Sequence, residues 1–571
     1  MLVSEAVAAA LAELGADTVF GLVGSGNFHV TNALIARGAR FVAARHEGGA
    51  ASMADAWARL TGRPGILSVH QGPGLTNAIT GITEAAKSRT PLLVLAADVA
   101  SGAVRSNFRI DVAALAQAVG AVPARLHSPG LAVDDAVRAY RTAAQERRTV
   151  ILALPLDVQA SECEMPEIKP TSPVGPASSS ALAARTGAGA GADLTAGAEA
   201  AASLAEAIAR ARRPVFIAGR GARHAHAGPD LARLADTCGA LLATSAAAKG
   251  LFRPNPWDLD VSGGFASPLT AELIRDADLV VGWGSSLNMW TMRHGNLIGP
   301  GAFVAQVDIE SAALGAHQPV NLGIAGDVVA VAREVAAILD AGGQLPPGTA
   351  AVGYRSGQLR DRIAREVRWR DVPYSDESSD GKIDPRTLTI ALDDMLPAER
   401  TVAVDSGNFM GYPSMYLSVP DSDGFCFTQA YQSVGLGLAS AIGSAIARPD
   451  RLTVAALGDG GALMGVSELE TAVRLGLPMV IVVYDDEAYG AEVHHFGPDG
   501  HPLDTVRFPP ADIAAIGQGF GCAAVTVRKP ADLGAVRDWL TGPRDDRPLL
   551  IDAKITSEHG SWWLEEAFRG H

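Results

Sequence analysis

The chain has 571 residues, of which 48% are apolar and 19% charged, and its 62 acidic against 47 basic side chains give a net charge of −15. This composition excludes a predominantly disordered chain, because so many apolar residues can bury a large core. The acidic balance argues against nucleic acid or an anionic membrane as a partner, although it does not exclude small anionic ligands.

The first sixteen residues predict an amphipathic helix rather than a signal peptide, because they carry Glu5 and Glu13 and lack a basic segment. No apolar stretch approaches the roughly 20 residues that a membrane-spanning helix needs. Four cysteines stand alone, without a C-x-x-C pair, which is typical of reduced thiols. They are Cys163, Cys238, Cys426 and Cys522. We therefore expect a soluble cytoplasmic protein.

Two segments rich in proline, glycine and small residues, 170–197 and 342–353, predict linkers. At roughly 100–200 residues per domain, the pieces between them are three plausible domains. The predicted boundaries are 1–168, 196–342 and 381–555, followed by a C-terminal tail or lid at 556–571.

Short apolar runs alternate with longer helical patterns in all three pieces. Such runs predict parallel strands that are buried on both faces. The expected fold class is therefore α/β, with three open parallel sheets flanked by helices. Ligands of such sheets bind beyond the carboxyl ends of the strands. The clearest runs are Ile66–Val69, Leu92–Ala96, Val150–Leu154, Val215–Ala218, Leu279–Val281, Phe303–Val307, Val402–Val404, Leu452–Leu457 and Met479–Tyr484.

Two turns in the first piece contain candidate functional residues. Glu47, in the string RHEGGA, follows a predicted strand at 41–43 and precedes a predicted helix at 50–59. On its own, a glutamate at that place could simply complement the helix dipole. The second turn, HQGPGLTN, begins at His70 directly after the next strand.

The middle piece has Gly219 and Gly221 after one predicted strand and Asp308 after another. A dinucleotide fingerprint requires a third glycine, where this chain has His224. We therefore expect a Rossmann-like domain with a structural role. A bound ADP, coenzyme A or FAD remains an open alternative.

The strongest signal lies between residues 452 and 490. One predicted strand ends before the turn GDGG, which contains Asp459, and the next ends at Asp485 and Asp486. Because both turns follow strands of one βαβ unit, Asp459 and Asp486 are expected to be neighbours. Two carboxylates and main-chain carbonyls suit a Mg²⁺ ion that keeps phosphate oxygens as further ligands. The glycines allow N–H groups to approach a diphosphate.

Together, these motifs resemble the signature of the thiamine diphosphate enzyme superfamily, in the group of acetolactate synthase, benzoylformate decarboxylase, oxalyl-CoA decarboxylase and 2-hydroxyacyl-CoA lyase. The resemblance covers nearly the whole chain, in the order pyrimidine-binding, central and diphosphate-binding domain. It implies thiamine diphosphate and Mg²⁺ as cofactors, with Asp459, Asp486 and the Ala488 carbonyl as metal ligands. One departure is Asp485-Asp486, because the family usually has two asparagines there; the aspartates add negative charge beside the diphosphate.

The resemblance also implies the cofactor contacts. Glu47 would contact N1′ of the pyrimidine and activate the cofactor, Val434 would wedge it into a bent shape, and the Gln432 carbonyl would accept from the 4′-amine. The pyrimidine domain of one subunit normally faces the diphosphate domain of another, which implies a homodimer at minimum and favours a homotetramer. The other expected contacts are Asn408, Phe409, Gly458, Asp459, Gly460, Gly461, Asp486, Ala488, Tyr489 and Gly490.

Two further residues bear on the reaction. Glu492 stands where pyruvate decarboxylase-type enzymes have a catalytic glutamate, and His70 stands where benzoylformate decarboxylase has a proton-transferring histidine. The alternatives are a solvent-exposed glutamate and a packed histidine.

The substrate is expected to be a small acyl-CoA or 2-keto acid. Segments such as Ala248–Leu251 resemble oxalyl-CoA decarboxylase and 2-hydroxyacyl-CoA lyase, so the first expectation is a carbon–carbon lyase that cleaves a short 2-hydroxyacyl-CoA to formyl-CoA and a ketone or aldehyde. Coenzyme A would need cations such as Arg220, Lys249 or Arg293. The alternatives are a 2-keto acid decarboxylase, an acetolactate synthase-like carboligase and a regulatory subunit that has lost catalysis.

Overall fold

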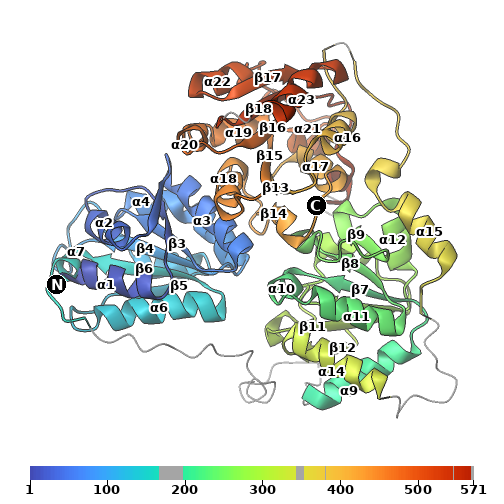
Figure 1. Cartoon of the computed structure of the whole chain (residues 1–571), viewed down its shortest axis with the longest axis horizontal. Helices are drawn as coiled ribbons and strands as arrows, with labels where there is room; N and C mark the ends of the chain where they lie inside the picture. Colours follow the sequence, from blue (N-terminus) through green and yellow to red (C-terminus); the bar gives the residue numbers. More distant parts are fainter. Residues whose placement is uncertain (166–196, 342–352, 380, 544–545, 568–571) are drawn as a thin grey trace.

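The computed structural model describes residues 1–165, 197–341, 353–379, 381–543 and 546–567 (Figure 1). This part of the chain forms three six-stranded sheets, and all of their strand pairs are parallel. Each of the nine apolar runs named above lies within a strand. The predicted α/β class with three parallel sheets is therefore confirmed. The two predicted linkers fall almost entirely outside the described residues.

The first sheet has the strand order β2-β1-β3-β4-β6-β5. Its strands are β1 (Thr18–Gly21), β2 (Arg40–Ala43), β3 (Gly65–Val69), β4 (Leu92–Asp98), β5 (Val122–Arg125) and β6 (Thr149–Pro155). Its helices are α1 (Val3–Glu13), α2 (Phe28–Ala36), α3 (Glu47–Thr61), α4 (Pro73–Lys87), α5 (Val112–Ala118), α6 (Ala132–Glu146) and α7 (Leu156–Gln159).

The middle sheet has the order β12-β11-β10-β7-β8-β9, which is the doubly wound order of dinucleotide-binding domains and confirms the Rossmann-like prediction. Its strands are β7 (Pro214–Ala218), β8 (Leu241–Thr244), β9 (Asp258–Val261), β10 (Leu279–Trp283), β11 (Phe303–Asp308) and β12 (Leu322–Ala325). The helices here are α9 (Gly197–Arg210), α10 (Arg220–His224), α11 (Gly228–Cys238), α12 (Pro268–Arg275), α13 (Met289–Met292), α14 (Val328–Asp340) and α15 (Gly357–Glu366).

The third sheet has the order β14-β13-β15-β16-β18-β17. Its strands are β13 (Arg400–Val404), β14 (Phe425–Phe427), β15 (Leu452–Gly458), β16 (Met479–Asp485), β17 (Ala523–Val527) and β18 (Leu549–Lys554). Its helices are α16 (Pro385–Met395), α17 (Gly411–Tyr416), α18 (Gly437–Ala447), α19 (Asp459–Met464), α20 (Glu468–Arg474), α21 (Gly490–Phe496), α22 (Ile513–Phe520), α23 (Gly534–Thr541) and α24 (Trp562–Ala567).

Counted along the chain, the strands of the first and third sheets follow the same order, 2-1-3-4-6-5. The helix that follows the second strand is α3 in the first sheet and α18 in the third, and these two helices pack against each other (Figure 1). Their side chains share one apolar core, in which Ala50 and Met53 meet Leu438 and Ile442. Gly443 allows this approach, because a Cβ there would collide with the backbone of Met53.

The described part of the C-terminal segment packs against the rest of the chain. Trp563 and Leu564 are buried, and the Trp563 ring lies against Phe265 and Trp290 at centroid distances of 6.2 and 6.1 Å. All four cysteines are free, and three of them are buried. Of the helices in the described residues, none is both long and apolar enough to cross a membrane.

Candidate active site

The carboxyl edge of the first sheet presents Glu47. It is the first residue of α3, which therefore begins three residues earlier than predicted, and His46 caps the helix by accepting from the Gly48 N–H at 3.0 Å. The Glu47 side chain is partly exposed, and its Oε2 accepts from Asn77 Nδ2 at 3.1 Å. Asn77 belongs to α4, so two neighbouring helices orient the carboxylate.

His70 lies at the same edge, between β3 and α4. Its Nδ1 is 3.1 Å from the Gly26 N–H, which donates to it, and its ring meets the Phe108 ring edge-on at 5.4 Å. Because Nδ1 accepts, a neutral His70 carries its proton on Nε2. That nitrogen is the one available for proton transfer, so the arrangement suits the predicted role.

The carboxyl edge of the third sheet presents the two predicted metal ligands. Asp459 is the first residue of α19, so the GDGG turn is itself a helix start, whereas the predicted helix began at 467. Asp486 directly follows β16. Burial and the charge of Asp485 raise the pKa of Asp459 to about 7, and burial and the charge of Asp459 raise the pKa of Asp486 to about 8. The two carboxylates therefore repel each other, which a cation between them would relieve.

The extra charge of Asp485 is directed elsewhere. This residue is buried, and its carboxylate forms an ion pair with Lys554 of β18. Lys554 also lies 3.1 Å from Asp552 and donates to the Ala511 carbonyl at 2.8 Å. Among the described residues Asp486 forms no ion pair, so of the Asp485-Asp486 pair it is the one whose charge would face the expected diphosphate.

Asn408 and Gly490 lie beside the Asp486 carboxylate, and the Phe409 ring lies next to Gly458, the residue before Asp459. A Cβ at Gly490 would collide with the Asp486 carboxylate and would lie 3.3 Å from the Asn408 amide nitrogen, so only glycine leaves this space open. The Asn408 Oδ1 accepts from the Ser561 N–H at 2.9 Å, and the Phe409 ring stacks on Tyr484 at 5.5 Å. The Asn408 amide is thus fixed, with its nitrogen directed to the glycine-lined space.

These residues fit a magnesium-bound diphosphate. In the described part of the chain, no cluster of three or more His, Cys, Asp or Glu side chains could hold a metal ion. Two facing carboxylates and a main-chain carbonyl at Ala488 leave coordination positions that phosphate oxygens would fill, as Mg²⁺ prefers. The glycine-lined space next to Asp486 provides the room.

The loop between β14 and α18 contains Gln432 and Val434. Gln432 has a left-handed backbone, with φ at +58°, and the Val434 side chain is 41% exposed. Both oxygens of Asp405 accept from the Gly435 N–H, at 3.1 and 3.0 Å. Asp405 is not among the predicted site residues, although its place directly after β13, at the carboxyl edge, is a usable signal.

Glu492 and Tyr489 lie on the exposed side of this edge. Glu492 is exposed on α21, and in the described residues its carboxylate has no hydrogen bond or ion pair. The Tyr489 ring is 39% exposed and meets Phe508 edge-on at 4.8 Å. His494 lies two residues after Glu492. Among the described residues its buried Nε2 has no hydrogen-bond partner, and burial together with the charge of His559 lowers the pKa of His494.

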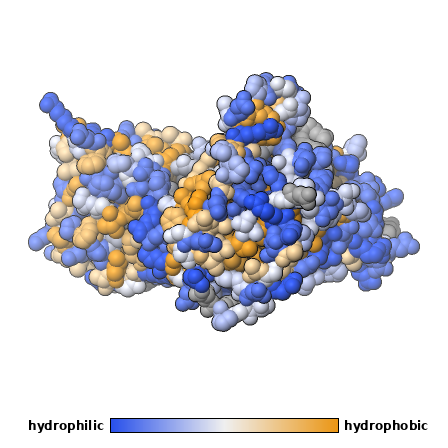
Figure 2. All heavy atoms as spheres, turned by 90° about the horizontal axis from the view of Figure 1, so that it is seen from above, coloured by the Kyte–Doolittle hydropathy of each residue, from blue (hydrophilic) through white to orange (hydrophobic). Residues whose placement is uncertain are grey.

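Within the described residues, the side chains of Glu47, His70 and Asn77 form no hydrogen bond or ion pair with Asp459, Asp486 or Asn408. Apolar side chains are exposed beside both edges, and Figure 2 shows apolar side chains reaching the surface over both lobes of the molecule. They are Val23, Phe28, Val104 and Phe108 in the first domain and Tyr431, Val434, Leu463, Met464 and Tyr489 in the third.

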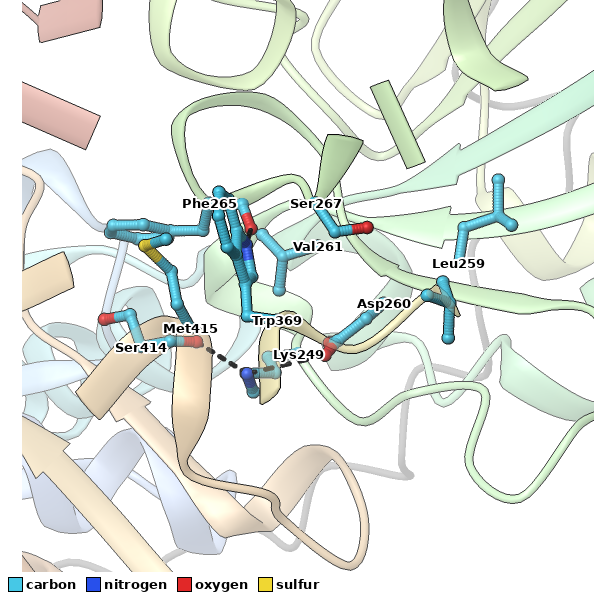
Figure 3. Close-up of a pocket in the computed structure, with 10 residues that line it drawn as sticks. Lys249, Leu259, Asp260, Val261, Phe265, Ser267, Trp369, Ser414 and Met415 are labelled. Carbon is cyan, nitrogen blue, oxygen red and sulfur yellow. Dashed lines mark hydrogen bonds and ion pairs between the residues drawn. The ribbon is translucent and has the colours of Figure 1, made fainter. Parts of the chain in front are cut away.

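Two of the three basic residues predicted to bind coenzyme A are buried and form hydrogen bonds within the protein. Lys249 is 2% exposed; its ammonium group donates to the Ser414 carbonyl at 2.6 Å and lies 3.6 Å from Asp260 (Figure 3). Arg293 is 7% exposed and donates to the Gly263 and Ala266 carbonyls at 2.9 and 2.8 Å.

Close packing explains why Gly219 and Gly221 of the middle domain are glycines. The N–H groups of Gly219 and Gly221 donate to the carbonyls of Trp283 and Gly284, both at 2.9 Å. A Cβ at Gly219 would collide with the Gly284 carbonyl. Close approach of two strand ends therefore explains these glycines without a nucleotide. Arg220, the third predicted cation, lies beside them, and burial with the charges of Arg59 and Arg89 lowers its pKa to about 10.

Comparison with known proteins agrees with this geometry. Residues 1–117 match the N-terminal binding domain of thiamine pyrophosphate enzymes, 201–335 match their central domain and 405–553 match their C-terminal binding domain. The chain is 31% identical to a probable 2-ketoarginine decarboxylase of Pseudomonas aeruginosa, over 96% of this chain and 93% of that protein. It is 28% identical to a sulfoacetaldehyde acetyltransferase of Rhodobacter capsulatus, over 99% and 96%. It is 24% identical to an acetolactate synthase large subunit of Escherichia coli, over 97% and 96%.

Proposed function

The chain belongs to the family of thiamine pyrophosphate (thiamine diphosphate, ThDP) enzymes, and on that premise we propose that it is a Mg²⁺-dependent decarboxylase of a 2-keto acid. The relative from Pseudomonas aeruginosa, similar over nearly its whole length, is named as a decarboxylase of this kind. 2-Ketoarginine is therefore the first substrate to test.

The observation that carries the proposal is the pair Asp459 and Asp486. Burial and the neighbouring carboxylates raise the pKa values of both, as expected of two acids that share a cation, and Asp486 lies next to a space that glycine keeps open. The Asp459 and Asp486 side chains and the Ala488 carbonyl would hold Mg²⁺, and Asn408, Phe409 and the glycines at 458, 460, 461 and 490 would enclose the diphosphate.

When bound, ThDP supplies a nucleophilic carbon and stores the electron pair released when the carbon–carbon bond breaks. Glu47 would exchange a proton with the pyrimidine, and Asn77, which donates to its carboxylate, would orient it for that exchange. Val434 and the Gln432 carbonyl would support the pyrimidine, and Tyr489 would lie on the diphosphate side. His70, through Nε2, and Glu492 would exchange protons with the substrate.

A complete site requires a second copy of the chain. The Glu47 edge and the Asp459 edge each expose apolar side chains, so each half is open on its own. We propose that the first domain of one copy covers the third domain of another, which gives a homodimer at minimum and two such dimers in a homotetramer. Four free cysteines are in keeping with a cytoplasmic location.

The alternative is cleavage of a 2-hydroxyacyl-CoA, the first expectation from the sequence. It is disfavoured because Lys249 and Arg293 already bind main-chain carbonyls and leave Arg220 as the one cation of the three for the phosphates. By the same reasoning we assign the middle domain a structural role, without ADP or coenzyme A.

The test is an assay of the protein with ThDP and Mg²⁺ on 2-ketoarginine, pyruvate, benzoylformate and branched-chain 2-keto acids. Release of CO₂ with the matching aldehyde is the expected result. Formyl-CoA from a 2-hydroxyacyl-CoA would assign the lyase instead, and acetolactate from pyruvate would assign a carboligase. Failure to bind ThDP in calorimetry would favour a regulatory subunit.

A variant tests the role of Glu47. We expect Glu47→Gln to lower kcat about 100-fold, because general acid–base groups contribute about 10²–10⁴. The Kd for ThDP should change by less than about 3-fold, since the diphosphate half provides most of the contacts. Glu13→Gln, an exposed glutamate of α1, is the control. An unchanged kcat in Glu47→Gln would remove Glu47 from the mechanism.

A further inference from the structure

Glu84 of α4 is a buried glutamate, 1% exposed, at the contact between the first and third domains. Its two carboxylate oxygens accept from the N–H groups of Ala430 at 3.1 Å and Tyr431 at 2.6 Å. Arg59 of α3 lies 2.7 Å from Glu84 and also donates to the Phe427 carbonyl at 2.8 Å. The first domain therefore holds the start of the loop between β14 and α18.

Glu468 of α20 makes the matching contact in the opposite direction. It is 2% exposed, and its Oε1 accepts from the N–H groups of Arg45 and His46, both at 3.0 Å. The Thr471 hydroxyl donates to the other carboxylate oxygen at 2.6 Å. The third domain therefore holds the turn that leads into α3.

The two contacts occupy equivalent places in the two sheets. Glu84 and Glu468 lie in the helical segments that follow the third strand of each sheet, β3 and β15. The loops that they hold both follow the second strand, β2 or β14, and lead into the packed helices α3 and α18. One arrangement is thus built twice, with donor and acceptor domains exchanged.

Both held loops lead directly to a cofactor residue. His46 precedes Glu47, and Tyr431 precedes Gln432, whose φ of +58° is unfavourable for a residue other than glycine. Gln432 and Val434 are exposed, so side-chain packing within the described chain does not fix them. A main-chain contact to a buried carboxylate fixes the loop where packing does not.

We propose that Glu84 and Glu468 are positioning residues: Glu84 sets the loop of Gln432 and Val434, and Glu468 sets the turn of Glu47. This inference rests on the proposed function, because it concerns residues that would contact ThDP. It adds that each domain's half of the site is held in place by the other domain of the same chain. If the two loops moved by about 1 Å after these contacts were lost, the reacting groups would be misplaced.

The test compares Glu84→Gln and Glu468→Gln with wild type in the full chain. Glutamine keeps the shape but offers only one acceptor oxygen, which is neutral. In Glu84→Gln one of the two N–H groups therefore loses its partner, because the two donate to different oxygens. In Glu468→Gln both N–H groups, which share Oε1, can keep an acceptor, but its charge is lost. Two quantities are measured: the Kd for ThDP with Mg²⁺ by calorimetry, and the rate of hydrogen–deuterium exchange at C2 of bound ThDP by NMR. The C2 exchange rate reports the action of Glu47. If Glu84 and Glu468 only stabilised the fold, their replacement would not alter this rate.

Matched controls come from the same helices. Thr83→Val removes a hydroxyl that donates only to the Ile79 carbonyl of its own helix, at 2.7 Å. Glu470→Gln removes a carboxylate of α20 that pairs with the Arg45 side chain at 2.6 Å rather than with its main chain. Both controls should stay within about 2-fold of wild type in both quantities.

We expect Glu84→Gln to raise the Kd for ThDP about 10-fold or more. Glu468→Gln should leave the Kd within about 3-fold but slow C2 exchange about 10-fold or more, since hydrogen bonds to a charged acceptor are stronger than those to a neutral amide oxygen. Wild-type values in both folded variants would overturn the inference, and so would equal changes in the controls. If wild type itself does not bind ThDP, the proposed function fails instead.

Two further variants address loss of folding, which far-UV circular dichroism detects. Glu84→Asp and Glu468→Asp keep the buried charge but withdraw it by one methylene from the main-chain donors. They should reproduce the separate effects on Kd and on C2 exchange. Aspartate variants that behave as wild type would contradict the inference, because the contact with the loops would then be unnecessary.

Discussion

The first and third sheets share one strand order, yet their carboxyl edges differ in charge. After the third strand of each sheet comes a G-x-G turn: Gly72-Pro73-Gly74 opens α4, and Gly458-Asp459-Gly460 opens α19. Proline at N1 only starts its helix, whereas aspartate at the equivalent place adds a buried carboxylate. This one residue gives the third sheet a carboxylate where the first sheet has none, which is in keeping with a cation site proposed only at the third sheet.

The fourth strands differ in the same way. β4 ends at Asp98, which pairs with Arg125, a side chain that is 41% exposed. β16 ends at Asp485, which pairs with Lys554, a side chain that is only 4% exposed. The fold thus places an acid at the same position twice, but only the third sheet buries the partner. Topology therefore determines where the acid lies, whereas burial of its partner determines how much the ion pair contributes to stability.

The largest expected effect follows from the first difference. Asp459→Asn makes the third-sheet turn neutral, like its proline counterpart, and removes one of the two carboxylates. We expect the affinity for ThDP with Mg²⁺ to fall about 1,000-fold, more than the 10–100-fold typical of residues that only support a metal ligand. Calorimetry measures it.

Asp499→Asn, an exposed aspartate of the loop after α21, is the matched control and should bind as wild type does. If Asp459→Asn also binds within 10-fold of wild type, then the difference between the two turns does not explain which edge takes the cation.

The second effect concerns the buried ion pair. Lys554→Met leaves the carboxylates of Asp485 and Asp552 without their cation in the core of the third sheet. We expect the free energy of unfolding to fall by about 3 kcal/mol, as breaking a buried pair typically costs. Urea denaturation measures it, with Lys382→Met as control, because that lysine is 33% exposed in its pair with Glu487. A loss below about 1 kcal/mol would show that burial does not matter here.

The sequence predicts the sheets well, because apolar runs on buried parallel strands differ from everything around them. It does less well with β5, whose residues are all half-buried, and with β18, where Asp552 and Lys554 interrupt a buried strand. In both strands the usual link between an apolar run and burial fails.

The candidate site was predicted where a motif lies in one short stretch of sequence. The sequence did not predict the roles of Lys554, Glu84 and Glu468, because burial of a charged residue depends on a distant partner. Glu84 lies 346 residues from Ala430, and Glu468 lies 422 residues from His46. A helical glutamate looks solvent-exposed until the domain that covers it is known.

The residues that follow the first strand of the first sheet and of the third sheet differ in their response to pH. β1 is followed by Leu22, which does not ionise, whereas β13 is followed by Asp405, whose pKa burial raises to about 6. An unfolded aspartate has a pKa of about 3.9, so between pH 4 and 6 the folded chain keeps a proton that the unfolded chain has lost. The stability that this proton contributes at low pH is therefore lost as the pH rises through that window.

We accordingly expect Asp405→Asn to remove part of the pH dependence of the cofactor-free protein. From pH 4.5 to 6.5, the wild type should lose about 2 kcal/mol more of its unfolding free energy than the variant does. Parallel stability curves for the two proteins would mean that Asp405 is not protonated in the folded chain.

The smallest effect is expected at the surface counterpart of Lys554. Arg125→Met breaks the pair with Asp98, but Asp98 still accepts from the Val99 N–H at 2.9 Å, and water reaches the place that Arg125 leaves. Asp98 is buried, but because Arg125 is 41% exposed we expect the unfolding free energy to change by less than about 1 kcal/mol. Measured beside Lys554→Met, this variant compares an exposed with a buried partner of an acid at the end of the fourth strand, although Lys554 also pairs with Asp552. Equal losses in the two variants would mean that the position of the acid at the strand end, rather than burial of its partner, sets the contribution of the pair.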